Sequence, residues 1–561
     1  MSLVRGMLPL CFDSAVPDPS TLDRTYARAM TREAVASTRI APRTSPLAGA
    51  AAGVASVVFG AGLEELVAAV VAPSSSPFSV VGGVLIDLAP PWAKDAAISI
   101  FGTNDKLALL VGIGVVLLVA AAAVGVLELR RPWAGVIVCA VLGAGVAVLA
   151  MFRADASAMS WIPSLVAGAA AAVALRFLTR LARRAAEASA EETRDGAGAP
   201  AAGVDGDRRR FLIWAGSAAA AGVLAAIVGS ALRAGSRTVE AVRGTLRLPK
   251  PVVAAPPLPA GAQLDVTGIS KVVTPNTGFY RIDTALIVPQ VDPSTWSLRI
   301  HGMVENEVVI GWEELLGLPL EESWTTLVCV SNPVGGELIG NAKWLGYPIR
   351  QLLERARPTS GADMVLSRSI DGFTAGTPLE VLQERDRAAI LAVGMNDEPL
   401  PAEHGFPVRM VVPGLYGYVS ATKWVTELEV TRFDRASAYW TDRGWSAKGP
   451  VKLQSRIDVP RRNQGLSPGD TVIAGVAWQQ HVGVSKVEVQ VDGGPWREAQ
   501  LATAISDDTW VQWSLPWRAE AGQHAIRCRA TNAQGETQTE TDSWPEPDGA
   551  TGWQQLNVSV A

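Results

Sequence analysis

The sequence predicts a multi-domain protein: an α-helical membrane anchor with five spans, then an α+β domain, then a β-sandwich. Three observations carry this prediction. Apolar runs long enough to cross a bilayer all lie before residue 233. From 263, short strands and short helices mix without regular βαβ alternation. From about 450, strand-like segments recur with turns about every eight to twelve residues. The expected segments are 1–46 (cytoplasmic), 47–232 (anchor), 233–262 (linker), 263–445 (α+β domain) and 446–561 (sandwich).

Composition excludes several classes of protein and site. A net charge of -5 gives no electrostatic basis for binding nucleic acid. The cysteines at 11, 139, 329 and 528 form no CxxC pair, so neither a zinc site nor a disulfide framework is indicated. No CxxCH motif is present and no histidine lies in the apolar half, so neither haem nor an iron–sulfur cluster is predicted.

Membrane helices are predicted from hydropathy, since a bilayer core needs roughly 20 apolar residues per span. The runs that meet this length are 47–71, 107–127, 133–152, 159–178 and 211–232. A further stretch, 77–101, is interrupted by prolines and charged residues, which indicates an interfacial or re-entrant piece instead of a sixth span.

Basic residues orient the anchor. With five spans, every arginine-rich segment falls on one side of the membrane, and this is the cytoplasmic side. These segments are 24–43, 130–131, 176–184 and 208–210. The N-terminus is then cytoplasmic, and the chain beyond 232 lies outside a multi-pass cell-membrane anchor. Glu64 and Glu65 fall inside the first run, where they indicate either a polar path or a helix-packing contact.

Residues 207–212 read DRRRFL before an alanine-rich run, a pattern that resembles a twin-arginine export signal. An ordinary positively charged anchor flank is the alternative. The Pro- and Ala-rich segment 233–262 predicts an extended tether. Residues 1–29 do not resemble the beginning of a membrane protein, so Met30 is an alternative initiator.

The soluble half divides into two patterns of elements. In the α+β part we expect strands at 296–302, 325–330 and 407–412, and helices at 312–317, 347–356 and 378–385. The sandwich strands are expected at 472–477, 487–491, 509–515, 524–530 and 553–560. Asp492-Gly493-Gly494 marks a hairpin turn between two of them.

Cys329 follows the apolar run 325–328 and precedes a Ser-Asn-Pro turn. A single cysteine in such a strand is ordinarily a small buried side chain. The alternative is a thiolate that is the only protein ligand of a transition metal whose remaining ligands come from a cofactor.

Four segments, in order, resemble the sulfite oxidase family of molybdopterin-dependent oxidoreductases, in a membrane-anchored bacterial form. They are 274–283, 326–332, 395–409 and 411–424, and the resemblance spans about 265–561. It implies a molybdenum–molybdopterin domain followed by an immunoglobulin-like β-sandwich of the family's dimerisation type.

The resemblance also implies the site residues. Cys329 is expected to ligate molybdenum, with Arg281 beside the metal, and both are expected to be catalytic. Arg409 is expected to clamp the cofactor phosphate through a bidentate contact, with His404 and Lys423 as further donors. The full expected cofactor-binding set is Asn276, Phe279, Tyr280, Arg281, Asp283, Cys329, Asp371, His404, Arg409, Ser420, Thr422 and Lys423.

Departures from the family pattern concern the substrate. Val334 and Val393 stand where sulfite oxidases carry an arginine and a tyrosine, and 479–483 replaces an arginine-bearing turn. A pocket lined by these valines would bind a tetrahedral dianion poorly, because its charge would lose water without gaining a partner. We therefore expect a small substrate other than sulfite.

The leading interpretation is a membrane-anchored redox enzyme that acts outside the cytoplasmic membrane by two-electron or oxygen-atom transfer. Its expected partners are a separate electron carrier or the quinone pool, membrane lipid, and a second copy of the chain through the sandwich. The alternative is a non-catalytic surface scaffold or adhesion protein that retains the fold. Such a scaffold needs none of Cys329, His404 and Arg409. The direction of the reaction stays open.

Overall fold

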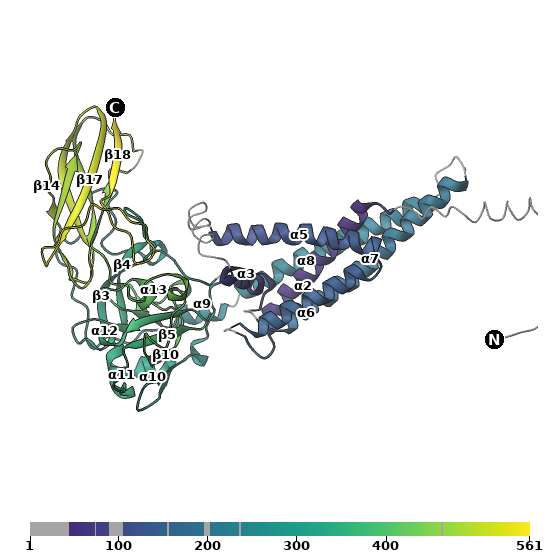
Figure 1. The fold of residues 1–561 in the computed structure, drawn as a ribbon, viewed down its shortest axis with the longest axis horizontal. Helices are drawn as coiled ribbons and strands as arrows, with labels where there is room; N and C mark the ends of the chain where they lie inside the picture. Colours follow the sequence, from purple (N-terminus) through teal and green to yellow (C-terminus); the bar gives the residue numbers. More distant parts are fainter. Residues whose placement is uncertain are drawn as a thin grey trace, which may run out of the picture.

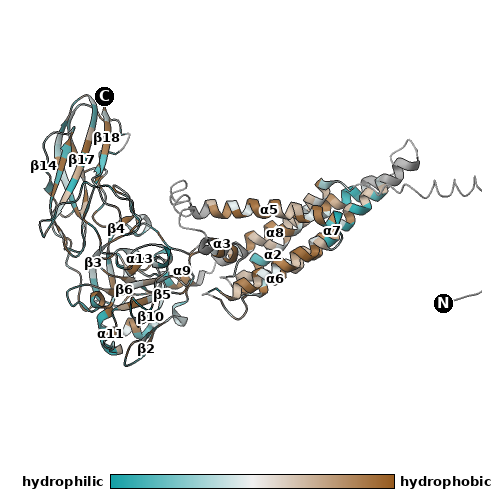
Figure 2. Cartoon of the chain, in the orientation of Figure 1, coloured by the Kyte–Doolittle hydropathy of each residue, from teal (hydrophilic) through white to brown (hydrophobic). Residues whose placement is uncertain are grey.

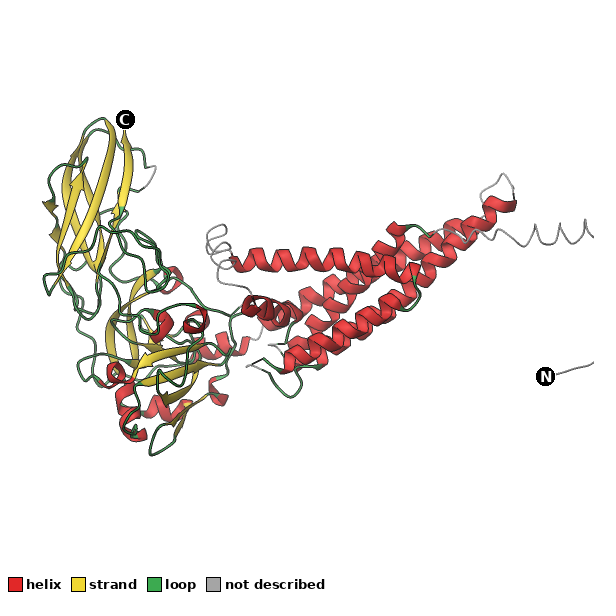
Figure 3. Cartoon of the chain, viewed as in Figure 1, coloured by secondary structure: helices red, strands yellow, loops and turns green. Residues whose placement is uncertain are grey.

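The computed structural model describes residues 44–72, 75–88, 105–153, 156–195, 202–234, 237–285, 287–461 and 464–561. Predictions that fall on 1–43, including the cytoplasmic segment and the alternative start at Met30, lie outside the described residues, as does 89–101. Figure 1 shows an elongated bundle of helices joined to a sheet-rich part, and Figure 3 shows that the strands gather in this second part.

Among the residues described, five helices are long and apolar enough to cross a membrane, judged by length and composition. They are α2 (Pro46–Val71), α5 (Asp105–Arg130), α6 (Ala134–Met151), α7 (Ile162–Asp195) and α8 (Ala202–Ala234). α7 and α8 extend beyond the predicted apolar runs through charged turns, visible as the hydrophilic end of α7 in Figure 2. Hydropathy sets the limits of an apolar run, whereas alanine, arginine and glutamate continue a helix past it. α3 (Pro77–Leu88) is too short for a span.

Small residues allow the helices to approach closely. A Cβ on Gly53 of α2 would lie 2.0 Å from the carbonyl oxygen of Ala121 in α5, so only glycine fits there. Glu64 and Glu65 are buried in α2. Glu64 accepts a hydrogen bond from Ser164 of α7 (2.6 Å), and Glu65 accepts one from Ser76 (2.8 Å). Both carboxylates therefore make packing contacts.

Basic residues of α7 lie beside the end of α5. Arg176 pairs with Glu128 (3.0 Å), and Arg183 donates to the carbonyl of Glu128 (2.7 Å). Arg130 and Arg131 follow directly along the chain. In Figure 1 this end of the bundle points away from the sheet-rich part.

The first soluble unit contains two sheets and short helices, as the mixed pattern predicted. One sheet has the order β3 (Glu321–Val328), β4 (Ile339–Pro348), β7 (Ile390–Met395) and β8 (Glu398–Pro399), with β9 (Arg409–Val411) on β7. The other has the order β2 (Val308–Gly311), β1 (Ser297–Gly302), β10 (Val425–Thr431), β5 (Met364–Ser369) and β6 (Thr374–Pro378). The helices are α10 (Trp312–Gly317), α11 (Ile349–Ala356), α12 (Leu379–Gln383) and α13 (Gly417–Ser420).

The C-terminal unit consists of two four-stranded antiparallel sheets around one hydrophobic core. One contains β11 (Gln454–Val459), β12 (Gly469–Trp478), β16 (Val511–Ala519) and β15 (Gln500–Leu501); the other contains β14 (Arg497–Glu498), β13 (Val484–Val491), β17 (Gly522–Asn532) and β18 (Gln555–Val560). Strict alternation of buried and exposed residues in β18 shows that one face covers the core.

The prediction of an extended tether over 233–262 is wrong. Residues 237–245 form α9 (Arg237–Thr245), and Val239 is buried in a cluster with Phe279. Beyond α9 the chain runs along the first unit: the Glu322 amide donates to Val253, and the Trp324 indole donates to Pro256 (both 2.8 Å). The proline and alanine content of this segment did not indicate that it contains a short amphipathic helix and a stretch that pairs with the edge of β3.

The C-terminal sheets are tied to strand β3 by Thr326. Its amide donates to the carbonyl of Asp508 (3.0 Å), its hydroxyl accepts from the Trp510 amide (2.9 Å), and its carbonyl accepts from Gln480 (2.9 Å). A residue three positions before Cys329 is therefore held by both units.

Arg456 makes a second buried link between the units. It pairs with Asp458 (2.7 Å) and donates to Gly336 and Ser270 (both 2.8 Å). Removing one partner of a buried pair leaves an uncompensated charge. We expect Arg456→Met to lower the free energy of unfolding by about 3–5 kcal/mol.

The measurement is denaturant-induced unfolding of the full chain in detergent, with tryptophan fluorescence as the signal. The matched control is Arg299→Met, which breaks an exposed pair with Glu307 (2.8 Å) and should change stability by about 1 kcal/mol or less. Equal effects for the two variants would contradict the structural role of Arg456.

Candidate active site

Cys329 lies in the turn directly after β3, one residue beyond the end of the strand. Its amide donates to the carbonyl of Leu338 (2.9 Å), and its carbonyl accepts from the Asn332 amide (3.0 Å). The Asn332 side chain in turn accepts from the Leu338 amide (2.8 Å) and closes the loop. The predicted strand 325–330 thus ends at 328, because the backbone must turn to present the thiol to a pocket.

The pocket beside Cys329 encloses about 900 Å³, its open mouth included. Eight of the twelve expected cofactor-binding residues line it: Phe279, Tyr280, Asp283, Cys329, Asp371, His404, Arg409 and Lys423. They come from the turn after β3, from the start of β9 and the turn before it, and from loops that are distant in the sequence.

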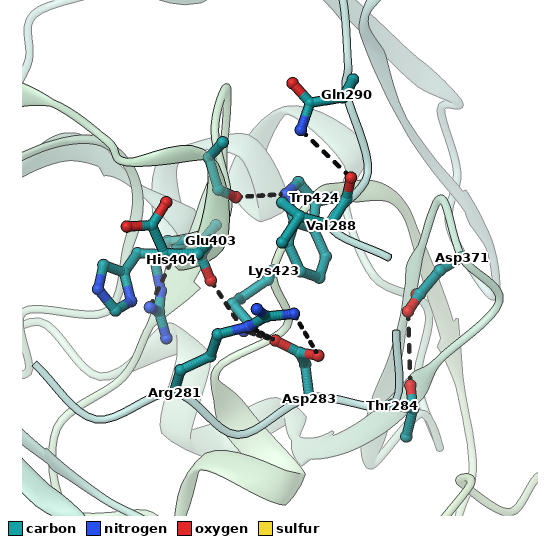
Figure 4. Close-up of polar contacts among 12 residues, drawn as sticks. Arg281, Asp283, Thr284, Val288, Gln290, Asp371, Glu403, His404, Lys423 and Trp424 are labelled. Atoms are coloured by element: carbon teal, nitrogen blue, oxygen red, sulfur yellow. Dashed lines mark hydrogen bonds and ion pairs between the residues drawn. The ribbon is translucent and has the colours of Figure 1, made fainter. Parts of the chain in front are cut away.

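Lys423 and Arg409 line the pocket, and Arg281 lies beside it; Figure 4 shows that Lys423 and Arg281 both reach Asp283. Lys423 donates to Asp283 (2.6 Å) and to the carbonyl of Glu403 (3.0 Å), and Arg281 also pairs with Asp283 (2.9 Å). The buried Arg409 donates to the carbonyl of His404 (3.1 Å). Within the described part of the chain, no carboxylate pairs with Arg409.

Burial lowers the pKa of three basic side chains in the pocket lining, those of Arg409, Lys423 and His404. It lowers the pKa of Arg409 to about 10. It also lowers the pKa of Lys423 to about 8, although Asp283 opposes the shift. Burial, with the charge of Arg409 second, lowers the pKa of His404 to about 4, so the imidazole is neutral at neutral pH. Burial raises the pKa of the Cys329 thiol. An anionic group in this pocket would stabilise the charged form of all three cations.

The low pKa of His404 predicts a pH dependence of stability. The unfolded histidine has a pKa near 6.5 and the folded one about 4, so the unfolded state binds more protons between these values. Stability of the cofactor-free chain should therefore fall by about 3 kcal/mol as the pH falls from 6.5 to 4. For His404→Gln, the denaturation midpoint should depend less on pH across this range.

His524 provides the control for that series. It lies on β17 and its pKa is raised, first by a hydrogen bond to Asp492. A histidine with a raised pKa makes the folded state more stable as the pH falls, so it cannot cause the loss of stability in acid. His524→Gln should therefore leave that loss of stability in place. An unchanged slope in His404→Gln would contradict the assignment.

Four expected residues do not line the pocket. Arg281 pairs with Asp283 beside it. Asn276 donates to the carbonyl of Met395 (3.2 Å) and holds its own loop. Ser420 donates to the carbonyl of Tyr416 (2.9 Å), and Thr422 exchanges a hydrogen bond with Ser367 (2.7 Å). The hydroxyls of Ser420 and Thr422 are fully buried and satisfied within the protein, so the expectation that these side chains contact a cofactor is not supported.

Sequence reasoning missed an aromatic wall. Tyr418, Trp440, Trp445 and Phe373 also line the pocket. The rings of Tyr418 and Trp445 lie 5.9 Å apart, and those of Trp440 and Trp445 lie 6.2 Å apart. The sequence feature that could have predicted this wall is the presence of two tryptophans within six residues of an otherwise polar loop.

The two valines expected in the pocket do not reach it. Val393 is fully buried in β7, and Val334 is half-buried in the loop after Cys329; neither lines the cavity. The expectation of a valine-lined pocket was wrong, because β7 directs Val393 into the core.

The residues present fit a pterin-bound metal. Among the described residues, no group of three or more His, Cys, Asp or Glu side chains is arranged to hold a metal ion. A metal at Cys329 would therefore need its other ligands from a non-protein group. The buried and unpaired guanidinium of Arg409 supplies the donors that a cofactor phosphate requires.

A family model described as the oxidoreductase molybdopterin binding domain matches residues 285–440. Sulfite oxidase from Gallus gallus is 28% identical over 340 residues, covering 52% of this chain and 72% of that protein. Residues 285–440 therefore form a molybdopterin-binding oxidoreductase domain, and about half of the chain is similar to sulfite oxidases. This confirms the expected family and enzyme class.

Other proteins are similar to this chain over different lengths. Mitochondrial sulfite oxidase from Rattus norvegicus is 27% identical over 48% of this chain and 58% of its own. The uncharacterized oxidoreductase YuiH of Bacillus subtilis is 29% identical over 31% of this chain and 83% of its own. The structure of the sulfane dehydrogenase SoxCD from Paracoccus pantotrophus aligns with a TM-score of 0.46 at 22% identity, covering 52% of this chain and 82% of that one.

Proposed function

We propose that the chain is a membrane-anchored molybdenum–molybdopterin oxidoreductase that acts on a small substrate outside the cytoplasmic membrane. The observation that carries the proposal is the shared pocket of Cys329, His404, Arg409 and Lys423. A scaffold has no use for the buried unpaired charge of Arg409, since desolvating a cation costs stability.

Each residue has a distinct task in this proposal. Arg409 binds the cofactor phosphate, and Lys423, held by Asp283, donates to the same cofactor. The neutral His404 donates from Nε2 to the carbonyl oxygen of Asn276 (3.2 Å), which fixes the orientation of its ring. Cys329 is the metal ligand: burial favours its neutral thiol, so the thiolate forms where a metal supplies positive charge. The bound molybdenum supplies two-electron or oxygen-atom transfer chemistry.

The substrate is proposed to be neutral and not a sulfite-like dianion. Lys423 and Arg281 both pair with Asp283, and Asp371 adds a second carboxylate to the lining. Arg409 is proposed to hold the cofactor. A dianion would therefore meet no uncommitted cation within the pocket lining. The aromatic wall offers a neutral surface instead.

The membrane part of the proposal follows from the helices. The basic ends of α5, α7 and α8 are assigned to the cytoplasmic side, which places the soluble units outside. The segment 207–212 is assigned to twin-arginine export, since a domain loaded with its cofactor must cross in the folded state. Electrons pass to a separate carrier or to the quinone pool. The C-terminal sheets are assigned to an immunoglobulin-like sandwich that dimerises.

The test is metal analysis and activity of the full chain purified from membranes of a host that makes the cofactor. We expect about one molybdenum per chain and dye-linked turnover of sulfoxides or N-oxides in preference to sulfite. A folded chain without molybdenum would contradict the proposal. Faster turnover with sulfite would contradict the substrate assignment alone.

A further inference from the structure

The pocket lies a short distance along the chain from the membrane helices. α8 ends at Ala234, and Val239 lies in the first turn of α9. Five residues span at most about 18 Å even when fully extended. Val239 is buried in the same cluster as Phe279, whose side chain lines the pocket. One wall of the pocket is therefore held close to the end of α8.

α9 is fixed to the pocket wall by more than one contact. Arg243 donates to the carbonyl of Pro399 (3.2 Å) and pairs with Glu398 (3.4 Å). Asn276, in the loop that leads to Phe279, donates to the same Glu398 carboxylate (3.4 Å). Figure 1 shows α9 between the helical bundle and the first soluble unit. These contacts set which face of the unit turns toward the bundle.

Apolar side chains are exposed at the pocket and in the segment that follows it along the chain. Ile282 lines the pocket and is 45% exposed, and Ile287 on the same segment is 47% exposed. Val242 of α9 is also exposed, and Arg247 and Lys250 follow it on the surface. Exposed aliphatic residues next to basic ones are typical of surfaces that rest on lipid headgroups.

We propose that Ile282 and Ile287 rest on the headgroup layer of the membrane that holds α8, so that the pocket opens onto the membrane surface. This inference depends on the membrane anchoring proposed above. Because solutes that partition into lipid headgroups concentrate at that surface, such a solute has the shortest path to Cys329. A reactant or electron partner of this kind then approaches the pocket along the bilayer.

The test measures lipid contact of the full chain in vesicles of phosphatidylcholine and phosphatidylglycerol. A bimane fluorophore is attached at Ile287→Cys or Ile282→Cys, with headgroup-nitroxide lipid as quencher. The control site is Glu498→Cys, on β14, which Figure 1 places away from the bundle. The cysteines at 139, 329 and 528 are buried, and labelling of the unsubstituted chain gives the background.

We expect several-fold stronger quenching at 287 and 282 than at 498. Equal quenching at all three sites would overturn the inference while leaving the anchoring intact. Flotation of the vesicles is measured in parallel. A chain that does not float with them would refute the anchoring itself, so the two failures are distinguishable.

Discussion

Cys329→Ser should abolish molybdenum-dependent turnover and remove molybdenum from the purified chain, while the fold persists. The thiol is 8% exposed and is the only cysteine in the pocket lining. Serine has nearly the same volume, so the surrounding packing is preserved. Its hydroxyl is a poor ligand because it does not ionise as readily as a thiol. Metal analysis and dye-linked activity of the membrane-purified variant test this.

Cys528→Ser is the matched control for that substitution. Cys528 is fully buried in the core of the C-terminal sheets and accepts a hydrogen bond from Ser455 (3.3 Å). A hydroxyl there can keep this bond, so metal content and turnover should equal those of the unsubstituted chain. If both variants retain molybdenum, the sulfur at 329 is not the ligand.

Arg409→Met should have opposite effects on two states of the protein. The cofactor-free chain should become more stable by an amount on the order of 1–3 kcal/mol, because the burial that lowers the pKa of the guanidinium to about 10 no longer costs free energy, while only hydrogen bonds to backbone carbonyls are lost. Cofactor binding should weaken by about 2–5 kcal/mol, because a buried charge-assisted contact is lost. Thermal unfolding of chain from a cofactor-deficient host, and pterin content of chain from a competent host, measure the two effects.

The control for this substitution is Arg368→Met. Arg368 is a more exposed arginine on β5 that pairs with Glu427 (3.5 Å). Its loss should change neither quantity by more than about 1 kcal/mol. A cofactor-free Arg409→Met chain that is less stable than the unsubstituted one would show that this guanidinium has a structural role.

Local patterns predicted the elements well where hydrophobic spacing is regular. The helix at 312–317 and the sandwich strands all form, because one face of each must be buried. Hydropathy located the five long apolar helices of the described residues, but it did not give their ends. α9 was missed because a nine-residue helix is stabilised by Phe279 and Glu398, which are distant in the sequence.

The site was predictable where single residues carry the chemistry. Cys329, His404, Arg409 and Lys423 meet in one pocket as the resemblance implied. Ser420 and Thr422 lie outside the pocket lining, because their hydroxyls are satisfied by a neighbouring backbone carbonyl and side chain in a tightly packed segment. Trp440 and Trp445 reach the pocket because of the path of their loop, which hydrophobic periodicity in the sequence does not predict.

The three hydrogen bonds at Thr326 limit how the enzyme can be shortened. A fragment that ends before Gln454 would remove Asp508, Trp510 and Gln480, and would leave the buried amide, hydroxyl and carbonyl of Thr326 without these partners. The turn that presents the thiol would then lose its support from behind. Any minimal catalytic version of this protein must therefore retain both C-terminal sheets, even if it is to work as a monomer.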